Sequence, residues 1–278
     1  MAIVLGLVTA ALFGSADFFG GLSAKKTSVL NVVAFAHLIG LIGAAAIAPF
    51  IADQFEWGDF LIGVASGAFG GIGVALLYRG LAIGPMAVVA PLTAITSASV
   101  PAIWGVLGGE RFAALGWAGV AVALCAIGLI SMPNEADDTP VTAIIIAQSL
   151  LAGACFGVMF ILFDAVGEAT APWPIVGARV MTSAVLLGFI FTARRDGLAT
   201  VGTALVPIAL TGLFDTGSNM IFLFATNLGD LSVVAVLSSL YPAATVVLAR
   251  LWLDERMSRT QLAGLAMALI ATAFIALG

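Results

Sequence analysis

Charged side chains are scarce in this chain. Of its 278 residues only 9% are Asp, Glu, Lys or Arg, whereas an ordinary soluble domain carries about 25%. Hydrophobic residues make up 62%, and the mean hydropathy is +1.19. Because so apolar a chain has too little polar surface to face water, the sequence excludes a soluble globular domain and predicts a membrane protein whose solvent is lipid.

The residue types that build metal centres and many catalytic sites are also rare. The chain has two cysteines, Cys125 and Cys155, and one histidine, His37. Both cysteines lie inside apolar runs, without metal-ligand or disulfide spacing. The sequence contains no H-E-x-x-H, no G-x-S-x-G and no phosphate-binding P-loop. We therefore expect no metal, no cofactor and no catalytic residue, while an intramembrane enzyme and a structural membrane subunit remain as alternatives.

The balance of charge bears on possible partners. The formal net charge is −5 at pH 7, and no cluster of basic residues occurs. Proteins that bind nucleic acid carry basic patches, so nucleic acid is not an expected partner. The expected partners are the lipid bilayer and a small-molecule substrate. A monomer is compatible with the sequence, which does not fix the oligomeric state.

One stretch of the chain occurs twice. Residues 84–96 read G-P-M-A-V-V-A-P-L-T-A-I-T, and residues 229–241, 145 positions later, read G-D-L-S-V-V-A-V-L-S-S-L-Y. Each copy continues in the same frame to a Glu-Arg pair, Glu110-Arg111 and Glu255-Arg256. A frame kept over this distance predicts a tandem duplication whose unit is about half the chain.

Ten apolar runs flank the polar segment 133–140, five on each side. Each is near the ~20 residues that a helix needs to cross hydrocarbon, and backbone groups without water partners must bond within a helix. The predicted spans are 1–22, 29–51, 60–78, 86–107, 113–132, 141–163, 172–193, 203–225, 232–253 and 260–277. We thus predict a first five-helix repeat at 1–132, a linker at 133–140 and a second five-helix repeat at 141–278.

The odd number of helices in each repeat decides how the repeats are related. A chain that crosses the membrane five times enters its second repeat from the opposite side. The two repeats are then related by a pseudo-two-fold axis in the membrane plane. The predicted fold class is an all-α membrane protein, with ten transmembrane helices forming an inverted repeat of two five-helix halves around a central cavity.

The basic residues predict an orientation in the membrane. Eight of the ten lysine and arginine residues fall in or beside loops on one side of the predicted topology: Lys25, Lys26, Arg79, Arg194, Arg195, Arg250, Arg256 and Arg259. Short cytoplasmic loops are enriched in such residues. This places both termini outside the cytoplasm, and the predicted location is the bacterial inner membrane.

Four ionisable residues lie inside the predicted spans: Asp17, His37, Arg179 and Asp215. A charge at mid-membrane costs about 2.5–3.5 kcal/mol even on insertion scales, so these side chains should not face lipid. They could pair with one another, for example Asp215 with Arg179, and hold the bundle together. They could instead form a polar patch in a water-filled cavity that contacts substrate or carries a proton.

Polar faces also recur on the fourth and ninth spans. Thr93, Thr96 and Ser97 share one helix face because they are three and four residues apart. Their counterparts in the second repeat are Ser238, Tyr241 and Pro242. These faces could serve only as hydrogen bonds between helices, but their recurrence in both repeats favours a shared central cavity.

The duplicated frame resembles a known family. The Phe-Gly pairs at 13–14 and 156–157, Gly109-Glu110-Arg111 and Asp254-Glu255-Arg256 are similar to features of the EamA-type exporters of the drug/metabolite transporter superfamily. Within that family the chain looks most like the bacterial exporters of aromatic amino acids. The resemblance implies export of amino acids, most of all aromatic ones, and of related amphipathic metabolites by alternating access. Other metabolites or drugs are the alternative substrates.

The resemblance also implies which residues line the central cavity. Carried onto this sequence, the substrate-binding residues are Tyr78, Thr93, Ser97, Phe160, Asp215, Asn219, Ser238 and Tyr241. Asp17, His37 and Arg179 are additional intramembrane polar residues that could couple transport to proton movement.

Overall fold

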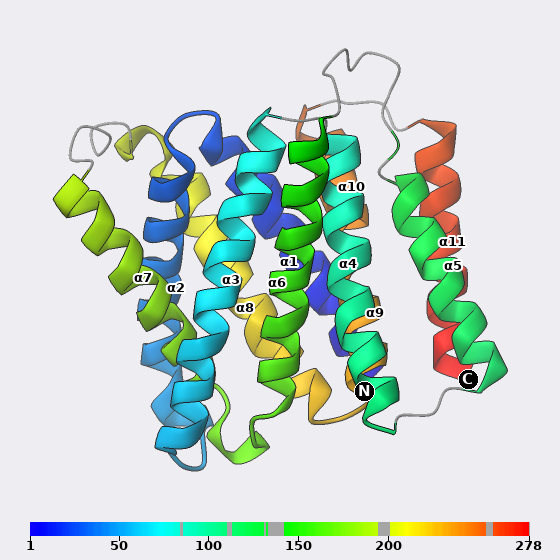
Figure 1. Cartoon of the computed structure of the whole chain (residues 1–278), viewed down its shortest axis with the longest axis horizontal. Helices are drawn as coiled ribbons and strands as arrows, with labels where there is room; N and C mark the ends of the chain where they lie inside the picture. Colours follow the sequence, from blue (N-terminus) through cyan, green and yellow to red (C-terminus); the bar gives the residue numbers. More distant parts are fainter. Residues whose placement is uncertain are drawn as a thin grey trace.

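The computed structural model of the protein describes residues 1–83, 86–109, 113–130, 132, 142–193, 201–253 and 258–277. The predicted linker and both Glu-Arg pairs lie outside these residues. The described part consists of helices joined by loops, without strands (Figure 1). Its α-helices are α1 (Ala2–Ala24), α2 (Val29–Ile51), α3 (Trp57–Ile83), α4 (Met86–Leu107), α5 (Ala114–Ile130), α6 (Ala143–Asp164), α7 (Trp173–Ala193), α8 (Leu205–Thr226), α9 (Leu231–Ser238), α10 (Tyr241–Leu253) and α11 (Arg259–Leu277).

Ten apolar stretches within these helices match the ten predicted spans. In the described part of the chain, α1, α2, α3, α6, α7 and α8 are each long and apolar enough to cross a membrane. Shorter apolar stretches cover 92–107, 114–129, 231–245 and 262–271. Large apolar side chains face outward, for example Ile42, Ile103 and Leu269, which are 63%, 61% and 69% exposed. A lipid surrounding accounts for this outer surface, and the predicted multi-span membrane fold is confirmed.

The two halves run through the bundle in opposite directions. In Figure 1, α1 starts at the lower edge, where the N-terminus is marked, whereas its counterpart α6 starts at the upper edge. The C-terminus is marked at the lower edge as well. Five helices per half therefore produce the inverted arrangement expected from an odd-membered repeat.

Helix packing is symmetric under exchange of the halves. The exchange replaces α1, α2 and α3 by α6, α7 and α8, α4 by α9 and α10, and α5 by α11. The packing of α1 on α8 thus corresponds to that of α6 on α3, and α2 on α8 corresponds to α7 on α3. The pairs α2–α7, α4–α9 and α5–α11 each join a helix to its own counterpart. The pseudo-two-fold axis therefore passes between these pairs.

Glycines permit the closest of these contacts. A Cβ atom on Gly67 of α3 would overlap the Ala178 carbonyl oxygen of α7, and one on Gly212 of α8 would overlap the Ala36 carbonyl oxygen of α2. Residues 67 and 212 are counterparts in the two halves, and so are 36 and 178. Small residues of this kind let helix backbones approach closely in membranes.

The ninth span differs from the prediction of one continuous helix. It is divided into α9 and α10 at Ser239 and Leu240. Pro242 has no amide hydrogen to donate to the Ser238 carbonyl, and its ring would clash with that carbonyl in a continuous helix. The counterpart of Pro242 in the first half is Ser97, and α4 runs unbroken through that position. The proline therefore makes the two halves unequal at the centre of the bundle.

Candidate functional site: a polar cavity between the two halves

A cavity lies between the halves at the centre of the bundle. Its walls come from α1, α2, α3 and α4 of the first half and from α6, α7, α8, α9 and α10 of the second. Ten of the eleven predicted site residues line it: Asp17, His37, Tyr78, Ser97, Phe160, Arg179, Asp215, Asn219, Ser238 and Tyr241. Residues far apart in the sequence thus meet in one space that the inverted repeat encloses.

Thr93 is the predicted residue that the structure does not bring to the cavity. It is fully buried, and its hydroxyl donates to the Ser149 carbonyl oxygen of α6 at 3.2 Å. A Cβ atom on Gly153 of α6 would lie 2.5 Å from the Thr93 carbonyl oxygen, so α4 and α6 are in close contact here. Thr93 therefore joins two helices, while Ser97, one turn further along α4, reaches the cavity.

A charged cluster forms one wall of the cavity. Arg179 of α7 places its Nη2 2.7 Å from Asp215 Oδ2 of α8, which confirms the predicted pair. Arg179 Nε donates to Thr216 Oγ1 at 2.9 Å, and Arg179 Nη1 lies 3.2 Å from His37 Nε2. His37 Nε2 is also 3.3 Å from Asp215 Oδ2. Charge-assisted contacts of this length are the strong ones inside a protein.

The cluster joins α2, α7 and α8. His37 and Arg179 occupy equivalent positions in the two halves, so their contact lies close to the pseudo-two-fold axis. Asn219 adds a further contact, since its amide nitrogen donates to the Asp215 carbonyl oxygen at 2.7 Å. The charges of Asp215 and Arg179 offset each other in the low-dielectric interior, which lets the pair persist away from water.

Several buried polar atoms of the lining have no hydrogen-bond partner among the described residues. They are His37 Nδ1, Asn219 Oδ1, Ser238 Oγ and Tyr241 Oη. Buried polar groups in proteins are nearly always satisfied by protein, water or ligand. Acceptor and donor groups from both halves thus remain available to a molecule in the cavity.

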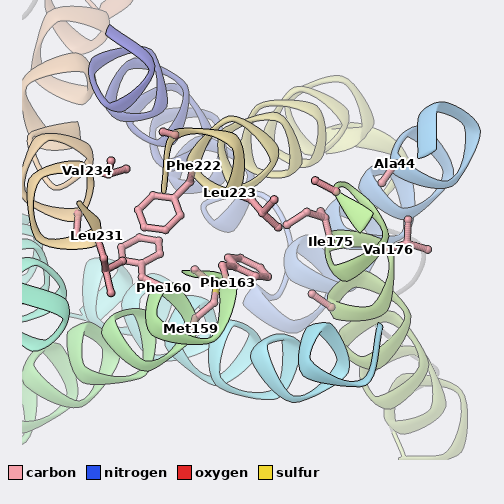
Figure 2. Close-up of a cluster of buried hydrophobic side chains, with 14 of the residues drawn as sticks. Ala44, Met159, Phe160, Phe163, Ile175, Val176, Phe222, Leu223, Leu231 and Val234 are labelled. Carbon is pink, nitrogen blue, oxygen red and sulfur yellow. The ribbon is translucent and has the colours of Figure 1, made fainter. Parts of the chain in front are cut away.

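Aromatic rings also line the cavity, and one of them stacks on a ring behind the lining. The rings of Phe160 and Phe222 are stacked with centroids 4.2 Å apart, and Phe13 lies 6.0 Å from Phe160. Figure 2 shows Phe160 of α6 facing Phe222 of α8, beside Leu231 of α9. The surrounding cluster includes Ala2 and Ala48 near the ends of α1 and α2, so it closes the cavity toward the edge that carries the termini.

A second apolar cluster lies toward the opposite edge. It contains Val32 of α2, Leu77 of α3, Val89 of α4 and Ile208 of α8. Leu77 and Val89 are the counterparts of Phe222 and Val234, which belong to the first cluster. The cavity therefore lies between two apolar clusters that the pseudo-symmetry relates to each other.

The broken ninth span brings hydroxyl groups into the cavity. Ser238 ends α9, Tyr241 begins α10, and Ser239 lies in the turn between them. The Ser239 hydroxyl lies 3.2 Å from that of Ser97 on α4. The break thus positions three polar side chains at the centre and links the two halves there.

Sequence reasoning did not include seven lining residues among the site residues: Phe13, Gly70, Val74, Leu77, Phe156, Met159 and Ser239. Phe13 and Phe156 are matching landmarks of the two repeats. Their recurrence at equivalent positions is the signal that could have placed them in the site. Ser239 required knowledge of the break between α9 and α10.

The cavity is narrow in this conformation. Its volume is about 40 Å³, whereas a single water molecule needs about 10–15 Å³ on the same measure. It therefore holds a few water molecules, and a solute as large as an aromatic amino acid enters only after the surrounding helices move apart.

Comparison with known proteins agrees with this architecture. Many membrane transporters carry their binding site in this position, near the midplane between two structural repeats. Residues 142–277 match the EamA-like transporter family. A solved structure, titled only "Crystal structure of protein", superposes with a TM-score of 0.78 at 18% identity, covering 99% of this chain and 96% of that chain. That similarity shows the fold. No curated protein matches the chain.

Proposed function

We propose that this protein exports small amphipathic solutes across the bacterial inner membrane, aromatic amino acids first and other hydrophobic or neutral amino acids next. The observation that carries the proposal is the central cavity, in which unsatisfied polar atoms and aromatic rings from both halves face one another. A cavity with apolar aromatic walls and a few polar anchors suits a solute that is partly apolar and partly polar.

The proposed mechanism is alternating access. The two halves rock about the cavity, and α3, α4, α8 and the α9–α10 pair open one apolar cluster while the other stays closed. Two related clusters on either side of the cavity support this mechanism, because each can serve as a gate in one of two equivalent states. The proposed binding residues are those that line the cavity, and the proposed orientation has both termini outside the cytoplasm.

Transport by purified protein tests the proposal. Liposomes containing the protein and loaded with phenylalanine or tryptophan should release these solutes faster than protein-free liposomes leak them. Glutamate and a neutral sugar serve as solutes that the cavity should not accept. Equal release with and without protein across a wide panel of solutes would remove the exporter function.

A further inference from the structure

Asp17 is the acidic lining residue that no other residue in the described part of the chain satisfies. It lies on α1 and lines the cavity, and it makes no hydrogen bond or ion pair with any residue that the structure describes. Its side chain is only partly buried, unlike those of the other charged lining residues. Part of its side chain is therefore accessible from the cavity.

The charges of the lining do not balance. Arg179 is the one lysine or arginine among the described lining residues, and it is paired with Asp215. Asp17 interacts electrostatically with Asp215, and two carboxyl groups repel each other. An unpaired carboxylate in the interior of a membrane protein is costly unless it takes up a proton or a group of opposite charge approaches it. A cation in the cavity would relieve both effects.

The groups around Asp17 fit an organic cation. Phe13 lies four residues before Asp17 on α1, so both share one helix face. The phenol of Tyr78 is packed against α1 at Gly20, one turn after Asp17. Aromatic faces attract organic cations, and Asn219 Oδ1 offers a further acceptor without a partner. A carboxyl group, an amide oxygen and aromatic rings are together suited to an ammonium group on an apolar body.

We propose that Asp17 binds the protonated amino group of the transported solute. The substrate class is then aliphatic amines that carry an aromatic or other apolar group, and an α-carboxylate is not required. Amino acids are substrates because they contain such an amine. This inference rests on the proposed transport function, and it names the part of the solute that the site recognises.

Three related solutes separate the amino group from the carboxylate. Phenylalanine has both groups, 2-phenylethylamine has only the amine, and 3-phenylpropionate has only the carboxylate. The assay measures the concentration of each solute that halves the transport of labelled phenylalanine in proteoliposomes. This concentration should be within about threefold of that of phenylalanine for 2-phenylethylamine, and about tenfold higher or more for 3-phenylpropionate. Equal competition by the amine and the acid overturns the proposal.

Variants of Asp17 test the residue itself. Asp17→Asn keeps the size of the side chain and should weaken the competition by 2-phenylethylamine about tenfold, whereas Asp17→Glu should keep it within about threefold. Asp53→Asn, in the exposed turn between α2 and α3, is the matched control, and 2-phenylethylamine should compete in this variant as well as it does in the wild type. A metal ion at Asp17 would give the same loss in Asp17→Asn without any preference for the amine over the acid, and that result also overturns the proposal.

A binding measurement separates this inference from the transport function. 2-Phenylethylamine should raise the unfolding temperature of the purified wild-type protein and of Asp17→Glu, but not that of Asp17→Asn. If the wild type exports phenylalanine and Asp17→Asn does so equally well, the role of Asp17 is wrong and the exporter function stands. If no amino acid is transported but the amine binds in an Asp17-dependent manner, the exporter function fails and the role of Asp17 stands.

Discussion

Arg179 holds three helices together through one guanidinium group. It contacts Asp215 and Thr216 on α8 and His37 on α2, and only 5% of its surface is exposed. Removing one member of a buried ion pair leaves the other as an uncompensated charge, which typically costs about 3–5 kcal/mol. We therefore predict that losing either charge alone destabilises the protein strongly, and that losing both together costs less than the sum of the two single losses.

A double-mutant cycle tests this prediction. Arg179→Met and Asp215→Asn should each lower the free energy of unfolding by about 3–5 kcal/mol, whereas the double variant should lose clearly less than the sum of the two. Reversible unfolding in detergent micelles gives the values, with Asp53→Asn as the control for an exposed carboxylate. Additive losses would mean that the two side chains do not act as a pair.

At the residue scale, the charged cluster could be predicted from residue types, whereas the residues that reach the cavity depend on how the helices pack. Unlike charges inside lipid must find each other, and this is why Asp215 and Arg179 could be paired from sequence. Helical spacing puts Thr93 and Ser97 on one face of α4, but one turn apart along the helix axis. Which of them reaches the cavity depends on where α6 approaches α4 most closely, and a single sequence does not contain that information.

The packing of α3 on α7 depends on the absence of side chains. A Cβ atom at Gly67 would overlap the Ala178 carbonyl oxygen, whereas one at Gly58, on the same helix, would meet nothing within 4 Å. Overpacking a close contact typically costs about 1–3 kcal/mol. Replacing a glycine by alanine in an open helical position instead stabilises by about 0.5–1 kcal/mol.

Gly67→Ala is accordingly predicted to destabilise the protein, and Gly58→Ala to stabilise it slightly. Gly212→Ala, at the equivalent position on α8, should resemble Gly67→Ala if the halves pack alike. Thermal unfolding of the three variants in one detergent provides the comparison. Equal effects of Gly58→Ala and Gly67→Ala would show that the α3–α7 contact is looser than the structure indicates.

Pro242 is predicted to set the shape of the cavity through the break that it causes. With Pro242→Ala an amide hydrogen becomes available to the Ser238 carbonyl, so α9 and α10 can join into one helix. Ser239 and Tyr241 would then turn away from their present positions. Solute transport should fall by about tenfold or more, since small misplacements of binding groups are expensive, while the protein stays folded.

Pro49→Ala is the matched control for this prediction. Pro49 lies inside α2 near its C-terminal end, is exposed, and is remote from the cavity lining. Its replacement also restores a helical hydrogen bond, but transport should not change. Unaltered transport by Pro242→Ala would contradict the role assigned to the break.

At the element scale, the sequence predicted the spans well and missed this break. Polar residues such as Lys25 and Asp53 mark where apolar runs end, and the helices begin and end within a few residues of those marks. The predicted ninth span, 232–253, is continuous through Pro242. A proline can bend a membrane helix or divide it, and the choice depends on neighbouring groups such as the Ser97 and Ser239 hydroxyls.

At the scale of the whole molecule, the architecture follows from the number of membrane spans in each half. Five spans in each half require the halves to lie in opposite directions, and the structure has this arrangement together with symmetric packing between them. The exact division of the chain at 133–140 stays a prediction. The volume of the cavity could not be predicted either, because a duplicated sequence is equally compatible with a wide and with a narrow cavity between the halves.

Solute exchange across proteoliposomes tests the central claim most directly, namely that the cavity between the inverted halves is the transport path. With unlabelled phenylalanine inside and a trace of labelled phenylalanine outside, the wild type should accumulate label transiently. Ser238→Phe, which fills the cavity, should behave like protein-free liposomes, and Ser15→Phe, at a half-buried position of α1 that does not line the cavity, should behave like the wild type. Exchange by Ser238→Phe at the wild-type rate would contradict the account.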